Sequence, residues 1–429
     1  MGAFLILVGA APKYFKLLRT QYWDQETRNR HICSRLDATL KAAARIRFYA
    51  ERFGGDPKAC EFSSLPILRR SEIPQLNQSV RALYPLGTNF SLDSSSGSTG
   101  MPVEFLFDRS HQLGRFAARA RYLRENGWSP ARRNVWLVYL GSYVGGEDLK
   151  LIRSRLLFRT RFLSIPSDFC ELAKELCRLD PVYLYAYPAF LDALIDGMQQ
   201  TGVRLASLQR VFTGAEVLED HVRSRAKRLL GVDISDNYGS TEAFIAWQCP
   251  AGKYHVNAEH VLVEIVDEQG HPAAPGEMGR VLVTTLQNHL MPLVRYEIGD
   301  YAVAAGDPCR CGRTLPTLDR IVGRGVNLFQ LKCGRLLSPW LLMGAVRDRV
   351  EVSQFQIVQK TIDWFLVRVV ADRPLSLSEQ ELIRTDFAKF IGSNVQVTFE
   401  RVAEIARTRA GKFMSTVSEV TATRQELIE

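Results

Sequence analysis

The sequence has 429 residues, more than the roughly 250–300 that one hydrophobic core accommodates, so we expect two or more structural units. Apolar residues make up 46% and charged residues 24%, the balance of an ordinary globular protein whose large core needs no disulfide bonds. The net charge of +9 suits an anionic partner, but the basic residues are spread along the chain and form no concentrated face with interleaved aromatic residues. We therefore expect no nucleic-acid partner, and a solvated basic surface or a polyphosphate ligand explains the charge.

The first predicted element is a helical region over residues 12–53, in which apolar residues recur at spacings of three and four. The apolar run Phe4–Val8 is too short to span a bilayer and lacks a basic leader, so we expect neither a signal peptide nor stable membrane insertion. Transient membrane contact by an amphipathic helix at this end stays open. Eight cysteines without a secretion signal indicate a reducing compartment, and we expect a cytoplasmic protein.

Beyond residue 53, short apolar runs alternate with helical segments, which predicts a layered α/β fold. The expected strands are Val135–Leu140, Val211–Thr213, Val261–Val266 and Val281–Thr284, and the expected helices are 110–126, 168–178, 189–200 and 217–230. From about residue 350 a separate β-β-α-β pattern predicts a small second domain. Its expected elements are the strands Phe355–Val358 and Phe365–Val370, a helix Ser376–Ile391 capped by Ser376 or Ser378, and the strand Val395–Phe399.

The strongest local signal is the segment Asp93–Pro102, which reads DSSSGSTGMP. Its hydroxyls and glycines form a loop whose backbone can approach phosphate oxygens and offer N–H and O–H donors. An ordinary Ser/Gly-rich turn explains the same residues equally well. The segment is not a Walker-type phosphate loop, because no Gly-Lys-Ser/Thr follows its glycines.

A second signal is Asn237–Glu242, which reads NYGSTE and follows the expected strand Val232–Ser235. Tyrosine can stack on a purine, a threonine hydroxyl can reach a phosphate, and a carboxylate can hold Mg²⁺. The alternative is a strand-to-helix turn capped by Ser240 or Thr241.

Two further segments carry chemistry. Arg295–Tyr301, RYEIGDY, places an aspartate after a glycine at an expected strand end, where it can accept both ribose hydroxyls. Arg409–Phe413, RAGKF, places a lysine in a basic turn near the end of the chain. Taken alone, this residue is more simply explained as a surface lysine.

In their order and spacing the four segments resemble the adenylate-forming ligases, most closely the phenylacetate–CoA ligase branch. The resemblance covers nearly the whole chain, from Gln21–Trp23 and Phe48–Tyr49 through Leu65–Leu68 to Gly411–Phe413 and Val417–Val420. It implies ATP-dependent activation of a carboxylic acid to an acyl-adenylate with release of pyrophosphate, and transfer of the acyl group to coenzyme A. It also implies an N-terminal adenylation domain over residues 1–323 and a small mobile C-terminal α+β domain over residues 324–429, which carries the catalytic lysine.

The resemblance also implies a role for each matching position in binding ATP. The mobile phosphate loop is expected to comprise Ser94, Ser95, Ser96, Gly97, Ser98, Thr99 and Gly100. The adenine side is expected to comprise Gly214, Ala215, Glu216, Asn237, Tyr238, Gly239 and Ser240, with Tyr238 flanking the base. Asp300 is expected to hold the ribose, and Arg320 and Arg324 to begin the link to the C-terminal domain.

The implied catalytic residues are Thr241, Glu242 and Lys412. Thr241 would touch the α-phosphate, Glu242 would bind Mg²⁺, and Lys412 would reach the carboxylate and the α-phosphate during adenylation. The chain departs from the family pattern at Met101, where many members have a lysine, and at Val326, where an acidic hinge residue is usual. Met101 in place of the lysine implies that one contact with pyrophosphate is missing. Val326 in place of the acidic residue implies that the hinge lies elsewhere or rotates less easily.

A Cys-x-Cys pair, Cys309 and Cys311, lies in a loop rich in glycine and proline, and Cys249 and His255 form a matching pair upstream. Three thiolates and one imidazole suit a tetrahedral Zn²⁺ site, whereas unpaired loop thiols are the simpler interpretation of Cys309 and Cys311 alone. Similar zinc clips in relatives of this branch favour the metal, and we expect it to be structural.

The acid is expected to be aromatic or otherwise apolar. The candidate pocket residues are Trp136, Tyr139, Leu140, Tyr185, Tyr187, Phe244 and Ile245, for which core packing is an equal alternative. The branch also includes ligases with amine acceptors, so amide formation stays open beside thioester formation. A non-catalytic nucleotide-binding module is a third hypothesis for the function. The sequence does not determine whether the chain forms a homodimer.

Overall fold

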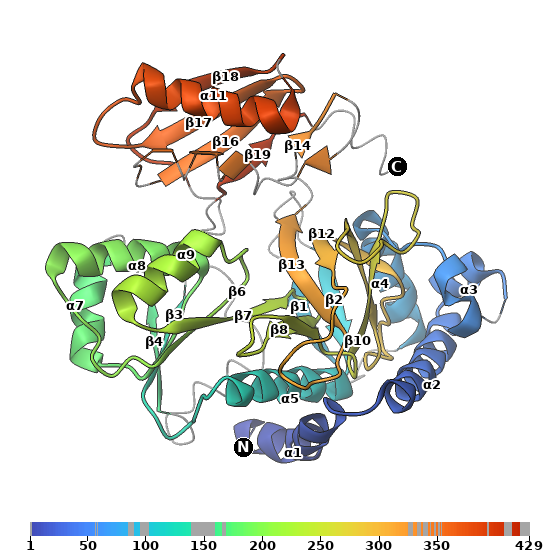
Figure 1. Cartoon of the computed structure of the whole chain (residues 1–429). Helices are drawn as coiled ribbons and strands as arrows, with labels where there is room; N and C mark the ends of the chain where they lie inside the picture. Colours follow the sequence, from blue (N-terminus) through green and yellow to red (C-terminus); the bar gives the residue numbers. More distant parts are fainter. Residues whose placement is uncertain are drawn as a thin grey trace. The chain divides into compact units, whose positions relative to one another are not determined.

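The computed structural model describes residues 2–55, 57, 59–84, 90–94, 103–138, 159–164, 169–324, 329–332, 336–337, 342–343, 345–346, 349–350, 352, 354–392, 394–406 and 414–420. The chain forms two compact units, Met1–Ile321 and Val322–Glu429 (Figure 1). The sequence places the domain boundary after residue 323, and the functions of the two domains remain predictions.

The N-terminal helical region consists of three separate helices: α1 (Gly2–Thr20), α2 (Gln25–Ala44) and α3 (Arg47–Phe53). The break between the first two falls at Asp24, whose carboxylate accepts a hydrogen bond from the Thr27 backbone N–H at 2.8 Å and thereby caps α2. The third helix ends at Gly54, which has φ +65°, a conformation that favours glycine. The 3₁₀ segments Ala59–Ser64 and Arg70–Glu72 and the helix α4 (Ile73–Leu83) follow.

An 11-stranded sheet runs through the first unit in the order β10-β11-β12-β13-β9-β8-β7-β6-β5-β3-β4. Its strands are β3 (Asn134–Val138), β4 (Thr160–Ser164), β5 (Tyr183–Tyr185), β6 (Arg210–Gly214), β7 (Asp233–Gly239), β8 (Phe244–Gln248), β9 (Tyr254–Val256), β10 (Val261–Val266), β11 (Met278–Thr285), β12 (Tyr296–Ala304) and β13 (Thr317–Arg324). The strands from β4 to β7 are parallel, and β7 to β9 and β10 to β12 pair antiparallel. The strands β1 (Ser91–Ser94) and β2 (Glu104–Phe107) form a separate antiparallel pair.

Helices cover the sheet at two flanks of this unit (Figure 1). The parallel strands pack against α7 (Phe169–Leu179), α8 (Pro188–Thr201) and α9 (Asp220–Arg225), which continues as a π-helical turn over Ala226–Leu230. The antiparallel strands pack against α2, α3 and α4, while α5 (Arg109–Glu125) lies against α1 and β8. The expected alternation of strands and helices is therefore confirmed as a mixed α/β fold.

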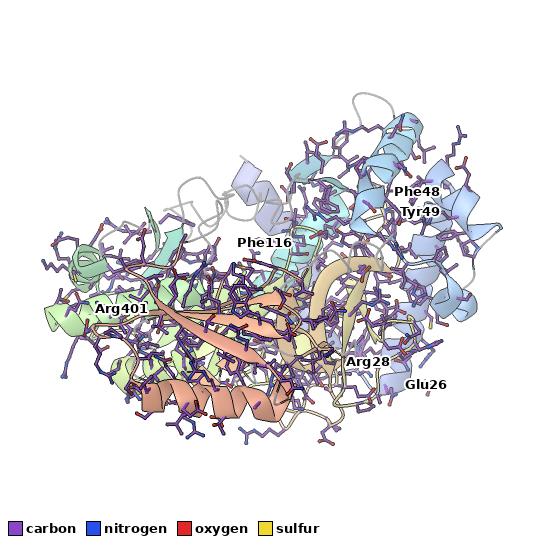
Figure 2. All side chains as sticks on the ribbon, turned by 90° about the horizontal axis from the view of Figure 1, so that it is seen from above. Glu26, Arg28, Phe48, Tyr49, Phe116 and Arg401 are labelled. Carbon is purple, nitrogen blue, oxygen red and sulfur yellow. The ribbon has the colours of Figure 1, made fainter. Side chains whose placement is uncertain are left out.

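Aromatic residues of α3 close the core on the antiparallel side. Phe48 and Tyr49 lie side by side, with ring centroids 5.2 Å apart in an edge-to-face arrangement (Figure 2). The buried Tyr49 hydroxyl donates to the Pro292 carbonyl at 2.8 Å, which fastens this helix to the segment before β12.

The second unit has a four-stranded sheet in the order β18-β17-β16-β19, and α11 (Leu377–Ile391) packs against it. Its elements are β14 (Phe329–Gln330), β15 (Leu336–Leu337), β16 (Gln354–Thr361), β17 (Trp364–Val370), α11 (Leu377–Ile391), β18 (Gln396–Arg401) and β19 (Thr416–Ser418). The Ser376 hydroxyl caps α11, and Glu379 completes a capping box. Of the two predicted caps, Ser376 and Ser378, the first is therefore confirmed. The short β19 pairs parallel to β16 and was not predicted from the sequence.

Candidate active site and metal centre

The candidate nucleotide site begins where the parallel strands β6 and β7 end side by side, with Gly214 opposite Asn237. A Cβ atom on Gly214 would lie 2.5 Å from the Asn237 amide nitrogen, so a larger residue there would displace the Asn237 side chain. Ala215 follows with φ +68°, a left-handed conformation that costs energy for alanine and is concentrated at functional sites. The predicted adenine-side segment thus turns sharply away from the sheet at this point.

The second motif does not form the strand-to-helix turn considered as its alternative. The strand β7 continues through Gly239, and the chain then turns directly into the antiparallel β8. The Ser240 backbone N–H donates to the Ala243 carbonyl at 2.9 Å, which closes this turn. Neither Ser240 nor Thr241 caps a helix, because the turn connects two strands.

Asp300 lies within β12, not at the strand end that the sequence suggested. The pairing of β11 with β12 shifts in register between the pairs Arg280–Tyr301 and Leu282–Glu297, which indicates a β-bulge. Gly299, in this part of β12, has φ +83°. A bulge of this kind re-aims the side chains beside it. The buried Asp300 carboxylate accepts a hydrogen bond from the Tyr238 hydroxyl at 2.8 Å.

Glu242 is buried, and its carboxylate accepts a hydrogen bond from the Tyr296 hydroxyl at 3.1 Å. Burial and the nearby Glu242 charge raise the pKa of Tyr296, so this hydroxyl remains a donor at neutral pH. The sequence analysis gave no role to Tyr296, although the residue lies in the segment Arg295–Tyr301. Its closeness to Asp300 in this short segment is the feature that could have identified it as a site residue.

These contacts bring together residues that are far apart in the sequence. The second motif supplies Tyr238 and Glu242 from the end of β7 and the turn after it, and the third motif supplies Asp300 and Tyr296 from β12. Glu216 is half-buried after β6, Arg320 is exposed on β13, and Arg324 ends that strand. Predicted functional residues outside the described part of the chain are Ser95, Ser96, Gly97, Ser98, Thr99, Gly100, Met101, Tyr139, Leu140, Val326 and Lys412.

The candidate acid-pocket residues occupy different surroundings. The Trp136 and Tyr185 rings stack with centroids 4.5 Å apart and planes 10° apart. Tyr187 precedes α8 and stacks on Phe190. Phe244 packs in the cluster around α5, whereas the next residue, Ile245, belongs to the core of the antiparallel strands, because successive residues of a strand face opposite sides.

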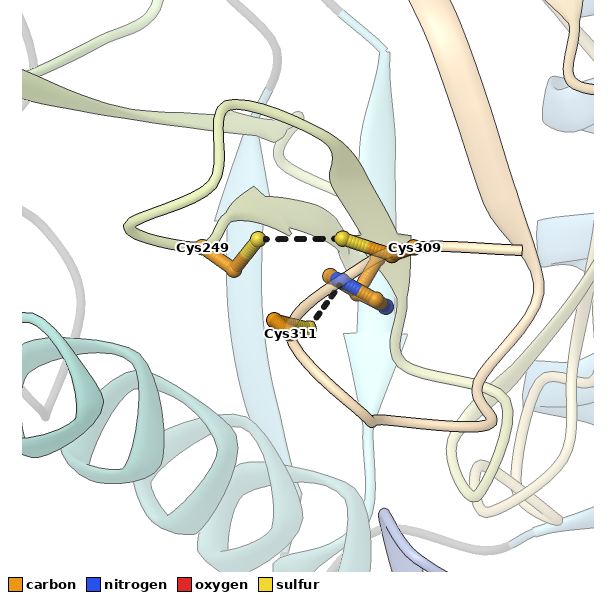
Figure 3. Close-up of side chains that lie close together, drawn as sticks. Cys249, Cys309 and Cys311 are labelled. Atoms are coloured by element: carbon orange, nitrogen blue, oxygen red, sulfur yellow. Dashed lines mark hydrogen bonds between the residues drawn. The ribbon is translucent and has the colours of Figure 1, made fainter. Parts of the chain in front are cut away.

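The predicted metal ligands converge in space. The ligand atoms of Cys249, His255, Cys309 and Cys311 all lie within 4.8 Å of one another. The two sulfur atoms of Cys249 and Cys309 are 3.6 Å apart, and the Cys311 sulfur lies 3.3 Å from His255 Nε2 (Figure 3). Ligand atoms around tetrahedral zinc are separated by about 3.8 Å for two sulfurs, so the arrangement fits this metal.

The electrostatics of the cluster suit a metal cation. Burial and the positive charge of Arg313 lower the pKa of His255 to about 4, so its imidazole is neutral at pH 7 and can ligate. Burial raises the pKa of Cys249 to about 12, which disfavours a thiolate without a bound cation. Although burial opposes it, hydrogen bonds from the Arg313 backbone and side chain lower the pKa of Cys311.

Two family models match the chain: AMP-binding enzyme over residues 152–291 and CapK C-terminal domain over residues 337–419. A phenylacetate-coenzyme A ligase of Thermus thermophilus is 25% identical over 398 residues, with 86% of each chain covered. A phenylacetate-coenzyme A ligase of Escherichia coli is 28% identical over 325 residues, covering 69% of this chain and 72% of the relative.

A solved structure of 2-hydroxyisobutyryl-CoA ligase in its postadenylation state has a TM-score of 0.77 to this chain at 19% identity, covering 96% of this chain and 94% of that one. This likeness confirms the predicted fold, a large N-terminal α/β domain followed by a smaller C-terminal domain. In the described part of the chain, no helix combines the length and the apolar character needed to cross a bilayer.

Proposed function

The chain belongs to the adenylate-forming superfamily, in the branch of the phenylacetate–CoA ligases, and from this premise we propose that it activates a carboxylic acid with ATP and transfers the acyl group to coenzyme A. The acid is aromatic or otherwise apolar. Relatives named as phenylacetate-coenzyme A ligases, and the 2-hydroxyisobutyryl-CoA ligase described in a postadenylation state, support an acyl-adenylate intermediate on the way to an acyl-CoA thioester.

The observation that carries the site assignment is the pair of hydrogen bonds between the two central motifs. Tyr238 donates to Asp300 at 2.8 Å, and Tyr296 donates to Glu242 at 3.1 Å. Each tyrosine hydroxyl uses one of the several acceptor positions of a carboxylate. We assign Asp300 to the ribose hydroxyls and Glu242 to a cation, and Tyr238, which lies beside Asp300, to the flank of the adenine.

The reaction needs positive charge at the phosphates. A carboxylate that attacks the α-phosphate meets charge repulsion, and pyrophosphate leaves with growing negative charge. Mg²⁺ held by Glu242 would neutralise this charge where it develops. We assign the Thr241 hydroxyl to the α-phosphate, the segment Ser94–Gly100 to the β- and γ-phosphates, and the Lys412 ammonium to the carboxylate and the α-phosphate.

We also propose that Cys249, His255, Cys309 and Cys311 bind a structural zinc ion. Their ligand atoms lie within 4.8 Å of one another, and three of the four residues are buried. The set has four protein ligands, which leaves no open position for a reactive water. The metal would pin the turn after β8 to the loop between β12 and β13.

A panel of acids tests the proposed function. Phenylacetate, 4-chlorobenzoate, anthranilate and 2-hydroxyisobutyrate, the acids named in the relatives and similar structures, are incubated with ATP and Mg²⁺ with and without coenzyme A. We expect acid-dependent release of pyrophosphate and formation of the matching acyl-CoA only when coenzyme A is present. Adenylate accumulation that only an added amine discharges would instead identify an amide-forming ligase, and binding of ATP without pyrophosphate release would identify a non-catalytic module.

A further inference from the structure

Arg115 of α5 is bonded to the backbone of the turn that carries the candidate catalytic residues. Its guanidinium Nη1 donates to the Thr241 carbonyl at 3.1 Å and lies 3.5 Å from the Asp93 carboxylate. The Arg115 side chain is only 13% exposed and the Asp93 side chain 10% exposed. A charged donor to a backbone carbonyl forms a stronger hydrogen bond than a neutral one, and Asp93 compensates the buried charge.

A second residue of the same helix packs against the same aromatic ring as Arg115. His111 lies four positions before Arg115, and residues at this spacing share one face of a helix. The His111 imidazole stacks on Phe107, with ring centroids 4.8 Å apart. The Arg115 guanidinium lies 5.6 Å from the centroid of the same Phe107 ring.

The helix itself is closely packed where it carries these residues. A Cβ atom on Gly114 would come within 2.4 Å of the Gln287 side-chain oxygen, so α5 packs closely against the segment after β11. The N-terminus of α5 is capped by Asp108, whose carboxylate accepts from the His111 backbone N–H at 2.7 Å. A rigid helix is a suitable support for groups that must keep a fixed geometry.

We propose that Arg115 is a positioning residue for adenylation, which fixes the Thr241–Glu242 backbone through its hydrogen bond to the Thr241 carbonyl and is itself held by Asp93. This role rests on the proposed function, in which Thr241 touches the α-phosphate and Glu242 holds Mg²⁺. Small displacements of such groups are costly, because the charge they stabilise develops only in the transition state. The effect that passes through Glu242 and its Mg²⁺ belongs to adenylation, because acyl transfer to coenzyme A releases AMP and involves neither pyrophosphate nor its metal.

The test measures both half-reactions for Arg115→Gln, Arg115→Lys, Asp93→Asn and the double variant Asp93→Asn/Arg115→Gln. It uses the acid of the panel with the fastest pyrophosphate release, together with its synthetic acyl-adenylate. For Arg115→Gln we expect kcat of adenylation to fall about tenfold and the Mg²⁺ concentration at half-maximal rate to rise, as for loss of one charged hydrogen bond. Arg115→Lys should recover part of the loss, and acyl transfer from the supplied adenylate should stay within about twofold of wild type.

The double variant separates positioning from direct contact with ATP. If Asp93 and Arg115 act as one link, the double variant loses little more than Arg115→Gln alone, because linked residues are not additive. Fully additive losses would overturn the proposal and indicate that Arg115 touches the nucleotide. Arg109→Gln, an exposed arginine of the same helix, is the matched control and should match wild type in both half-reactions.

Three further outcomes reject the role. Equal losses in adenylation and acyl transfer for Arg115→Gln, with a lowered melting temperature, would reduce Arg115 to a folding residue. If Arg115→Gln releases pyrophosphate as fast as an active wild type, the positioning role is overturned but the proposed function is not. A wild-type chain that releases no pyrophosphate with any acid of the panel would overturn the proposed function and this role with it.

Discussion

At the scale of single residues, the site contains two buried carboxylates, each bonded to a tyrosine hydroxyl from the other motif. Glu242 accepts from Tyr296, and Asp300 accepts from Tyr238. The two carboxylates differ in position, because Glu242 follows the β7 turn and Asp300 lies on the bulged strand β12. This difference predicts different kinetic consequences when each negative charge is removed.

The first prediction concerns Glu242→Gln. Because the metal's contribution grows as charge develops on the leaving pyrophosphate, we expect a strong fall in kcat of adenylation at saturating ATP, on the order of a hundredfold. Excess Mg²⁺ should recover part of this loss. Titration of Mg²⁺ at saturating ATP checks the expectation, and Glu26→Gln, whose side chain is 83% exposed on α2, is the matched control.

The second prediction concerns Asp300→Asn. The proposed contact of Asp300 with ribose would exist in both the ground state and the transition state, so the main effect should be a raised KM for ATP. A charged acceptor paired with sugar hydroxyls contributes about 1.5–3 kcal/mol, which corresponds to about a ten- to hundredfold rise. Initial rates over a range of ATP concentrations measure it. Rescue of Asp300→Asn, but not of Glu242→Gln, by Mg²⁺ would exchange the two roles.

Sequence reasoning found both carboxylates because each lies in a short motif with its own chemistry. It did not find the Tyr296–Glu242 contact or the Arg115 link, since these join residues 54 and 126 positions apart and depend on how the elements pack. The left-handed Ala215 was also invisible, because alanine rarely adopts that conformation and its sequence gives no signal.

At the scale of elements, α5 is fastened to the sheet by a buried ion pair. The Arg121 guanidinium donates to the Glu259 carboxylate at 2.7 Å, and the Thr20 hydroxyl of α1 donates to the same carboxylate. Although burial opposes ionisation, Arg121 lowers the pKa of Glu259 to about 2, from an ordinary value of 4.5. One carboxylate therefore connects α1, α5 and the segment before β10.

The third prediction follows from the sign of this shift. A depressed pKa in the folded state contributes stability above about pH 4.5, which is lost as the pH falls towards about 2. Glu259→Gln should therefore unfold more easily than wild type by about 3–5 kcal/mol at pH 6, because it leaves Arg121 buried without a charged partner. The gap should narrow by about 1–2 kcal/mol at pH 3.5.

Denaturant unfolding of both proteins at pH 6 and pH 3.5 measures this change, with the exposed Glu26→Gln as control. A gap that stays constant or widens on acidification would show that Glu259 is not the ionised partner of Arg121.

The fourth prediction concerns the metal loops. Elemental analysis of protein prepared without chelator should find about one zinc per chain, and Cys311→Ser should lose it. The variant should have a lower melting temperature but nearly unchanged affinity for ATP, because the proposed metal connects loops and has no open position. Cys33→Ser, an exposed thiol of α2, should keep both the metal and the stability. Metal-free wild-type protein would remove the zinc proposal without affecting the ligase proposal.

The elements themselves were largely predictable, because strands and helices such as β10 and α11 carry strong periodicity and capping signals. The prediction that was wrong concerns Asp300, which was expected at a strand end but lies within β12 beside a bulge. For the second motif, the strand-to-helix turn was the alternative interpretation, and the antiparallel pairing of β7 with β8 excludes it. Strand pairing is non-local, so neither outcome could be obtained from a local sequence window.

At the scale of the whole molecule, the chain has two units that each possess a hydrophobic core. The residues bonded around Glu242 and Asp300 belong to the first unit, and Lys412 belongs to the second. The proposed role of Lys412 belongs to adenylation, in which it would reach the carboxylate and the α-phosphate. The division of the chain therefore predicts that the two half-reactions can be separated by mutation.

The last prediction is that Lys412→Ala nearly abolishes adenylate formation while acyl transfer from a supplied acyl-adenylate stays largely intact. An ammonium beside the attacking carboxylate and the α-phosphate acts only while charge develops there, and loss of one such group costs about 10²–10³ in rate. Transfer to coenzyme A includes neither the attack of a carboxylate on the α-phosphate nor the release of pyrophosphate, so we expect it to depend on other contacts. Pyrophosphate exchange measures the first half-reaction, and thioester formation from synthetic acyl-adenylate measures the second. Lys360→Ala, a lysine of the same unit that pairs with Glu419, is the control and should affect neither. Equal loss of both half-reactions in Lys412→Ala would contradict the assignment and indicate a lysine needed for folding.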